Sequence, residues 1–189
     1  MENLTFARLR KDYAPLDNPI ILIDSSSLIK THAFSTLMQI CCPLMENRPF
    51  LIPRSCITEL ANSIVQRAAA NDPGYINAVV STIQGVDELT GKKVLRLIGA
   101  AEDTAAEVIL EYVMLNRKKG ITVITQDPCI AEDIGRINSF QSISFPPILV
   151  RRLTPHGSLE EFSCNDPLDR TRFFPANPQE HRDISENSW

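Results

Sequence analysis

The sequence predicts an α/β fold of three layers, in which helices cover both faces of a central, mostly parallel sheet of four or five strands. Two short apolar runs lack any polar alternation, at residues 20–23 and 121–125, and both are rich in β-branched side chains. Such runs are typical of strands buried on both faces, as parallel strands are. Helical patterns follow these runs, and strands that alternate with helices favour a parallel sheet.

The chain has the length of one domain with short appendages. It has 189 residues, of which 43% are hydrophobic and 22% charged, so it can bury a core without disulfides or a structural metal. We expect an N-terminal arm at residues 1–18, the sheet domain at 19–150 and a polar tail at 151–189. The tail is rich in Pro, Asn, Asp, Arg and Ser and lacks periodicity. It is expected to dock on a protein partner or a second copy of the chain, or to remain solvated.

Composition also narrows the classes of protein. No apolar run approaches the ~20 residues of a membrane span, and the N-terminus lacks the apolar stretch of a secretory signal. Five cysteines without a CxxC pair indicate reduced thiols and a cytoplasmic location rather than a disulfide framework or a zinc site. A net charge of −4 argues against a generic nucleic-acid coat, but it is compatible with a metal site built from acids.

In the first half of the chain, the strand at 20–23 is followed by a helix that Ser25, Ser26 or Ser27 caps. A second strand at 50–52 precedes a helix with Ser55 as its N-cap and apolar residues at helical spacing. Residues 71–74 form a turn before a helix at about 75–84. Residues 94–98 form either a strand or an irregular lead-in.

In the second half, a helix is predicted at 102–118, with Gly120 ending it. Its buried stripe is expected to comprise Ala106, Ile109, Leu110, Val113 and Met114. The strand at 121–125 leads to a short helix with Asp127 as N-cap and Pro128 at its first position. A last strand is expected at 143–145.

Four acids fall where the strands end or one helical turn away. Asp24 ends the first strand, Glu59 lies in the helix after the second, Asp103 opens the long helix, and Asp127 follows Thr125. Ligands bind at the carboxyl ends of strands in such sheets. Asp127 could be only a cap, and Asp103 only an acid at a helix N-terminus. The phase of Asp103 with Ala106 nevertheless points it toward the core edge, so we expect the four acids to form one cleft.

Carboxylates gathered in one cleft favour Mg²⁺ or Mn²⁺, because these hard cations take oxygen ligands. A bound metal activates water near neutral pH and stabilises charge on a phosphoryl transition state. No cysteine or histidine is placed for nucleophilic catalysis. The residues therefore predict metal-assisted hydrolysis.

Four segments of the sequence resemble the four blocks of the PIN-domain nucleases, in the family's order. They are IILIDSSSL at 20–28, FLIPRSCITEL at 50–60, AEDTAAEVI at 101–109 and ITVITQD at 121–127. The resemblance covers roughly residues 19–145. It departs from the compact PIN toxins in its N-terminal arm, the long helical stretch at 61–100 and the polar tail.

The resemblance implies that Asp24, Glu59, Asp103 and Asp127 hold Mg²⁺ or Mn²⁺. It further implies a metal-dependent endoribonuclease that hydrolyses the phosphodiester bonds of RNA, which we expect to be single-stranded. The side chains expected to support the site are Ser26 and Thr125, by hydrogen-bonding its carboxylates, and Asp133, as an outer ligand. The PIN domains are not all toxins, so the biological role stays open.

Two other classes compete with this interpretation. Phosphoryl-transfer α/β enzymes with an Asp nucleophile would show Asp-x-Asp or an acidic pair after the first strand, whereas Ser26 stands two residues after Asp24. The stronger alternative is a catalytically weak PIN-like scaffold that acts through protein–protein interaction. The complete set of four acids argues against it, because a scaffold gains nothing from clustered like charges.

Overall fold

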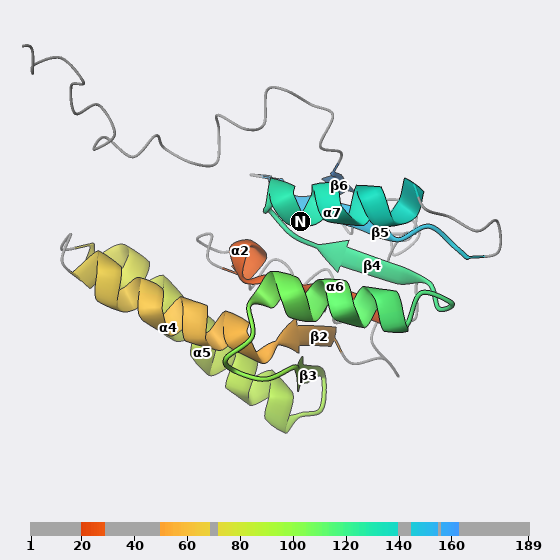
Figure 1. Ribbon diagram of the computed structural model, residues 1–189. Helices are drawn as coiled ribbons and strands as arrows, with labels where there is room; N and C mark the ends of the chain where they lie inside the picture. The colour runs from red at the N-terminus through yellow and green to blue at the C-terminus, as the bar shows by residue number, and fades with distance from the viewer. Residues whose placement is uncertain (1–19, 29–49, 69–71, 140–144, 155, 163–189) are drawn as a thin grey trace, which may run out of the picture.

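A computed structural model describes residues 20–28, 50–68, 72–139, 145–154 and 156–162 of the chain. Strands and helices alternate along most of it (Figure 1). In chain order they are β1 (Ile20–Ile23), α2 (Ser25–Leu28), β2 (Phe50–Pro53), α4 (Arg54–Ala68), α5 (Pro73–Gly91), β3 (Leu95–Ile98), α6 (Ala105–Leu115), β4 (Ile121–Ile124), α7 (Pro128–Ser139), β5 (Leu149–Leu153) and β6 (Leu159–Glu161).

The strands form one sheet in the order β3-β2-β1-β4-β5-β6. The first five are parallel to their neighbours, and β6 is antiparallel to β5. Strand β1 lies at the centre, where Leu22 is in register with Leu51 of β2 and with Val123 of β4. The sheet is mostly parallel, as the sequence predicts, but it has six strands in the described part of the chain rather than four or five.

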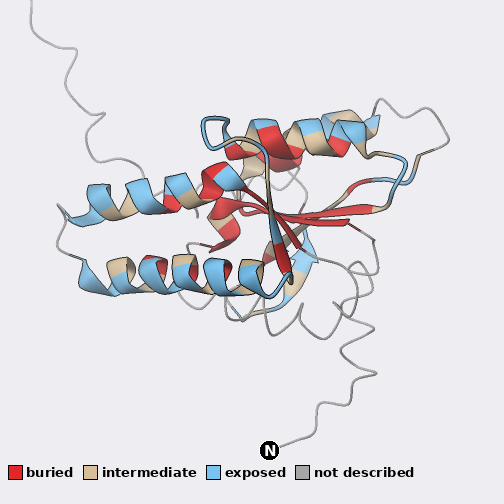
Figure 2. Ribbon diagram, turned by 90° about the horizontal axis from the view of Figure 1, so that it is seen from below, coloured by how far each residue is buried: buried red, intermediate tan, exposed pale blue. Residues whose placement is uncertain are grey.

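Side chains of the central strands alternate between two cores, which gives the fold its three layers. Ile21 and Ile23 of β1 face the core that α4 and α5 cover, whereas Ile20 and Leu22 face the core that α6 and α7 cover. Figure 2 shows the central strands β1, β2 and β4 in the buried colour and the helices with their outer sides exposed. The three-layer α/β/α architecture is therefore confirmed.

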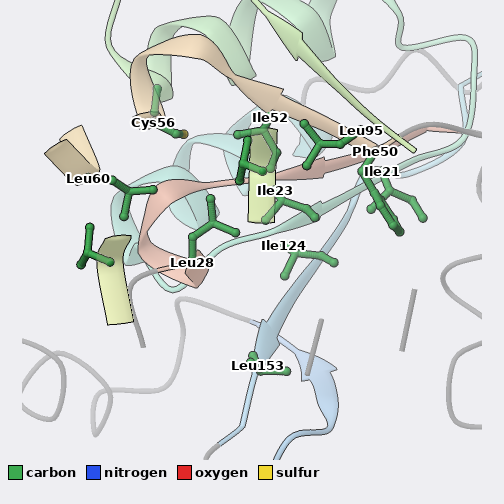
Figure 3. Close-up of a cluster of buried hydrophobic side chains, with 13 residues drawn as sticks. Ile21, Ile23, Leu28, Phe50, Ile52, Cys56, Leu60, Leu95, Ile124 and Leu153 are labelled. Carbon is green, nitrogen blue, oxygen red and sulfur yellow. The ribbon is translucent and has the colours of Figure 1, made fainter. Parts of the chain in front are cut away.

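The core beneath α4 and α5 runs across most of the sheet (Figure 3). Its labelled members come from five strands and from α2 and α4: Ile21, Ile23, Leu28, Phe50, Ile52, Cys56, Leu60, Leu95, Ile124 and Leu153. Burial of a large aliphatic or aromatic side chain contributes about 1.5–3 kcal/mol. This packing fixes the strand ends from which the functional side chains project.

Several predicted elements keep their place but change their limits. Residues 95–98 form a strand, which settles the ambiguity at 94–98. Helix α5 runs from Pro73 to Gly91 rather than to about residue 84, and the side chain of its N-cap Asp72 accepts from the Tyr75 N–H. Helix α4 begins at Arg54, so Ser55 lies inside the helix and is not its N-cap.

The predicted long helix is shorter and slightly rotated. Helix α6 starts at Ala105 and ends at Leu115, because Thr104 and Glu107 form a capping box at its start and Asn116 closes its end. Its buried side chains are Ala105, Val108, Ile109 and Val113. Met114, predicted to be buried, is 57% exposed, because the stripe that faces the sheet is offset toward Val108 and Ile109.

The sheet continues past residue 150, where the sequence analysis placed the end of the domain. That boundary falls inside β5, and β6 follows it. Phe162 is buried in the core beneath α6 and α7, and Leu159 packs on the other core. The apolar residues of 151–162 therefore belong to the sheet rather than to a polar tail. Residues 163–189, the arm at 1–18, most of the helix after Ser25 and residues 143–144 lie outside the described residues.

None of the helices in the described ranges is long and apolar enough to cross a lipid bilayer.

Candidate functional site

The predicted site lies at the carboxyl ends of the parallel strands, where Figure 1 shows the starts of α2, α4 and α6 meeting. Asp24 directly follows β1, and its backbone N–H donates to the carbonyl of Ile124 at the end of β4 over 3.0 Å. This bond extends the β1–β4 pairing by one residue and places Asp24 beside Thr125.

Hydrogen bonds from the described residues hold one oxygen of the buried Asp24 carboxylate more firmly than the other. Its Oδ2 accepts from the Thr125 hydroxyl at 2.9 Å, from the Ser26 backbone N–H at 3.3 Å and from the Ser26 hydroxyl. Its Oδ1 has a single 3.4 Å contact, with the Ser25 hydroxyl. One carboxylate oxygen is therefore fixed in place, and the other keeps lone pairs for a further ligand.

The two hydroxyls that bind Asp24 also hold the chain after β4. Ser26 Oγ accepts from the Gln126 N–H, and Thr125 Oγ1 accepts from the Asp127 N–H, both at 2.9 Å. Ser26 and Thr125 thus link two loops about 100 positions apart in sequence. Their predicted geometry, hydrogen bonding to a site carboxylate, is present.

Glu59 reaches the same place from α4. Its Oε2 accepts from the Ser25 hydroxyl at 2.5 Å, and its Oε1 accepts from the Ala105 N–H at 3.4 Å. Ala105 is the first residue of α6, where backbone N–H groups are free of helical partners and the helix dipole favours a negative charge. Glu59 is therefore held between two elements although it lies on the surface.

Burial raises the pKa of Asp24 above its ordinary value, because removal from water disfavours the charged form. Hydrogen bonds from Ser26 and Thr125 lower this pKa, and the negative charge of Glu59 raises it further. Among the described residues, neither Asp24 nor Glu59 forms an ion pair with a Lys, Arg or His. A buried carboxylate without a cation is costly. The pair is therefore suited to bind a cation from solution.

Asp103 does not occupy the position the sequence predicts. It lies in the loop before α6, is exposed, and its Oδ2 accepts from the Ala100 N–H at 3.2 Å. The helix phase that would have turned it toward the core edge does not apply, because α6 begins two residues later. Asp103 is thus near Ala105 in sequence, but its carboxylate forms a hydrogen bond within its own loop.

Asp127 is the helix cap that the local sequence predicts. Its Oδ1 accepts from the Cys129 N–H at 2.8 Å, and Pro128 begins α7. Its backbone joins the site through Thr125, while its carboxylate faces the helix start.

Asp133 lies one turn further along α7 and pairs with Arg136 at 3.3 Å. Both side chains are substantially exposed, so this contact is a surface ion pair. No bond joins Asp133 to Asp24 or Glu59.

The chemistry of these oxygen donors suits the implied metal, but their spacing in this structure does not bring enough of them together to hold it. Within the described residues, no group of three or more His, Cys, Asp or Glu side chains is spaced to hold a metal ion. Asp24 and Glu59 supply two hard oxygen donors, and no Lys, Arg or His of the described ranges pairs with either carboxylate. Asp103 and Asp127 would have to release the Ala100 and Cys129 N–H groups to join them. The structure thus brings two of the four acids together and leaves two in local hydrogen bonds.

Sequence reasoning missed Ser25, which contacts both carboxylates of the pair. It was expected only as a helix cap, since adjacent serines after a strand are common at caps. Cys56 also lies against the pair. Burial, and then the charges of Asp24 and Glu59, raise the pKa of its thiol, so the thiol stays protonated.

No protein-family model matches the chain, and no curated protein is significantly similar to it.

Proposed function

We propose that this chain is a PIN-like, divalent-metal-dependent endoribonuclease that hydrolyses single-stranded RNA. The observation that carries the proposal is the buried Asp24 carboxylate, which Ser25 connects to Glu59 and which pairs with no Lys, Arg or His in the described part of the chain. An acid in that environment gains nothing for folding. A bound Mg²⁺ or Mn²⁺ would offset its cost.

Each residue of the pair has a separate task. Asp24 offers Oδ1 as a ligand, because Ser26 and Thr125 bind Oδ2 and fix the orientation of the carboxylate. Glu59 offers a second carboxylate from α4. When bound, Mg²⁺ or Mn²⁺ supplies an activated water and stabilises charge on the phosphate.

Asp103 and Asp127 complete the ligand set in this proposal. Both stand at the same edge of the sheet, and the carboxylate of each accepts from a backbone N–H within three residues. A single exposed hydrogen bond contributes about 0.5–1.5 kcal/mol. That is small compared with the attraction between a carboxylate and a divalent cation, so both side chains can turn toward the pair.

The test is cleavage of a fluorescent single-stranded RNA by the full chain with Mn²⁺, with Mg²⁺ and with EDTA. Wild-type protein should cleave only with metal, and the Asp24→Asn variant should not cleave. Asp133→Asn serves as a matched control, because it removes one carboxylate from a surface ion pair. Activity in EDTA, or full activity of Asp24→Asn, would overturn the mechanism.

A second candidate is a PIN-like scaffold that binds a protein partner and cleaves poorly. The observation in its favour is that Asp103 and Asp127 already have partners and that no three acids stand at ligand spacing among the described residues. Wild-type protein that binds Mn²⁺ only at millimolar concentrations and leaves RNA intact would support it. In either case we place the protein in the cytoplasm, where the thiols of Cys56 and Cys129 remain free.

A further inference from the structure

The Ser25 hydroxyl stands between the two carboxylates, 2.5 Å from Glu59 Oε2 and 3.4 Å from Asp24 Oδ1. We infer that Ser25 is a positioning residue, which holds Glu59 at the distance from Asp24 at which both can bind one divalent cation. This inference rests on the proposed function, since it concerns the same site.

The Ser25 hydroxyl has one hydrogen to donate, so it can form a strong hydrogen bond with only one of the two carboxylates. A hydroxyl donates one hydrogen, and an ionised carboxylate can only accept. The hydroxyl therefore donates its hydrogen bond to Glu59 over the short contact. The 3.4 Å contact with Asp24 Oδ1 is weak and leaves that oxygen nearly free to bind a ligand. Ser25 thus orients one ligand without occupying the lone pairs of the other.

Glu59 needs such a partner more than Asp24 does. Its side chain has one more rotatable bond and lies at the surface, and the like charge of Asp24 repels it. Without Ser25, the bond that remains to Glu59 from the described residues is the 3.4 Å contact with the Ala105 N–H. Asp24, in contrast, keeps three donors on Oδ2.

Ser25 is itself well anchored. It is the first residue of α2, follows β1 by one residue and is buried. Its position is set by the same strand that sets Asp24. The backbone therefore fixes the Cβ of Ser25 relative to Asp24, and the rotamer that this structure shows places the hydroxyl against Glu59.

The same helix contains a matched control. Ser27 is also buried, and its hydroxyl has no hydrogen-bond partner among the residues that the structure describes. Replacing either serine with alanine removes the same atom from the same short helix. Only at position 25 does that atom contact the carboxylates.

The experiment is calorimetric titration of the full chain with Mn²⁺, with no RNA present. Loss of a residue that orients a ligand costs about 10–100-fold in metal affinity. Ser25→Ala should therefore weaken Mn²⁺ binding at least about 10-fold. Ser27→Ala should bind Mn²⁺ as the wild type does, and Ser25→Thr, which keeps a hydroxyl, should bind more tightly than Ser25→Ala. Thermal melting in EDTA checks that each variant is folded.

The outcomes separate this inference from the proposed function. Wild-type affinity in Ser25→Ala, or an equal loss in Ser27→Ala, overturns the role of Ser25 even if RNA is cleaved. Weakened Mn²⁺ binding in Ser25→Ala alone supports the role of Ser25 even if no RNA is cleaved, in which case only the nuclease function fails. A wild-type chain that binds no Mn²⁺ overturns both.

Discussion

The four acids at the edge of the sheet divide into two pairs that differ in what holds them. Asp24 and Glu59 each accept a bond from a group far away in sequence, since Thr125 and Ala105 are 101 and 46 positions distant. Asp103 and Asp127 bond to N–H groups three and two residues away. Long-range bonds exist only in the folded chain, whereas short-range bonds satisfy a loop or a helix start wherever it lies. The first pair is therefore the better evidence for a site.

The largest effect is expected at Asp24. Asp24→Asn should lower RNA cleavage by more than the ~100-fold that loss of an outer partner can cost, because it removes a ligand itself. The asparagine oxygen can still accept from Ser26 and Thr125, so the fold should persist. The measurement is the single-turnover cleavage rate with Mn²⁺ at saturating enzyme. If the variant cleaves RNA at a rate within about 10-fold of wild type, Asp24 is not a metal ligand in the reaction.

The same variant has a predicted dependence on pH. Burial raises the Asp24 pKa, so the folded chain keeps this proton to higher pH than the unfolded chain, and stability falls as pH rises from the ordinary value of 3.8 through the raised one. Asp24→Asn removes that loss. In EDTA its melting temperature should exceed that of the wild type at neutral pH, by about 2–4 °C for each kcal/mol regained. The difference should shrink toward zero below the ordinary pKa. A wild-type chain that melts at the higher temperature at neutral pH would contradict the sign.

The second prediction sharpens the comparison at Asp127. Asparagine is an N-cap as good as aspartate, whereas alanine loses about 0.5–2 kcal/mol. If the carboxylate is also a ligand, Asp127→Asn should lose cleavage without losing stability, and Asp127→Ala should lose both. Cleavage rates and denaturant midpoints of the two variants measure this. Full activity in Asp127→Asn would show that Asp127 is only a cap.

A third prediction concerns Asp103, whose bond to Ala100 is exposed. Asp103→Asn keeps an acceptor for that N–H, so its unfolding free energy should stay within about 0.5 kcal/mol of wild type. Cleavage should nevertheless fall, and the Mn²⁺ concentration needed for half-maximal activity should rise. Unchanged Mn²⁺ dependence would reduce the site to the pair Asp24 and Glu59.

The smallest effect is expected at Asp133. Its ion pair with Arg136 is exposed, and such pairs contribute about 0–1 kcal/mol. Asp133→Asn should change the melting temperature slightly, more at low salt than at high salt, and leave cleavage unchanged. A loss of activity would restore Asp133 as an outer ligand.

The contrast between the two pairs also explains how far the sequence could predict this molecule. The buried strands at 20–23 and 121–124 are readable because unbroken β-branched runs leave few alternatives, and they fix where Asp24 lies. The position of Asp103 depends on the first turn of α6, and a capping box at Thr104 and Glu107 moved that turn by three residues. Strand β6 was missed because it has three residues, two of them Glu, and its pairing with β5 becomes visible only in the fold.

Both faces of β1 are buried, and this limits which amino-acid substitutions the strand before Asp24 can tolerate. All four residues of β1 are buried and alternate between two cores, so the strand has no side on which a substitution could be accommodated by solvent. Val65 of α4 is 73% exposed and carries no such constraint. In a library of random substitutions, variants at 20–23 should be depleted by selection for folding alone, including in an inactive background. At Asp24 the conservative change to Asn, and at the exposed Glu59 most changes, should in contrast be depleted only when activity is selected.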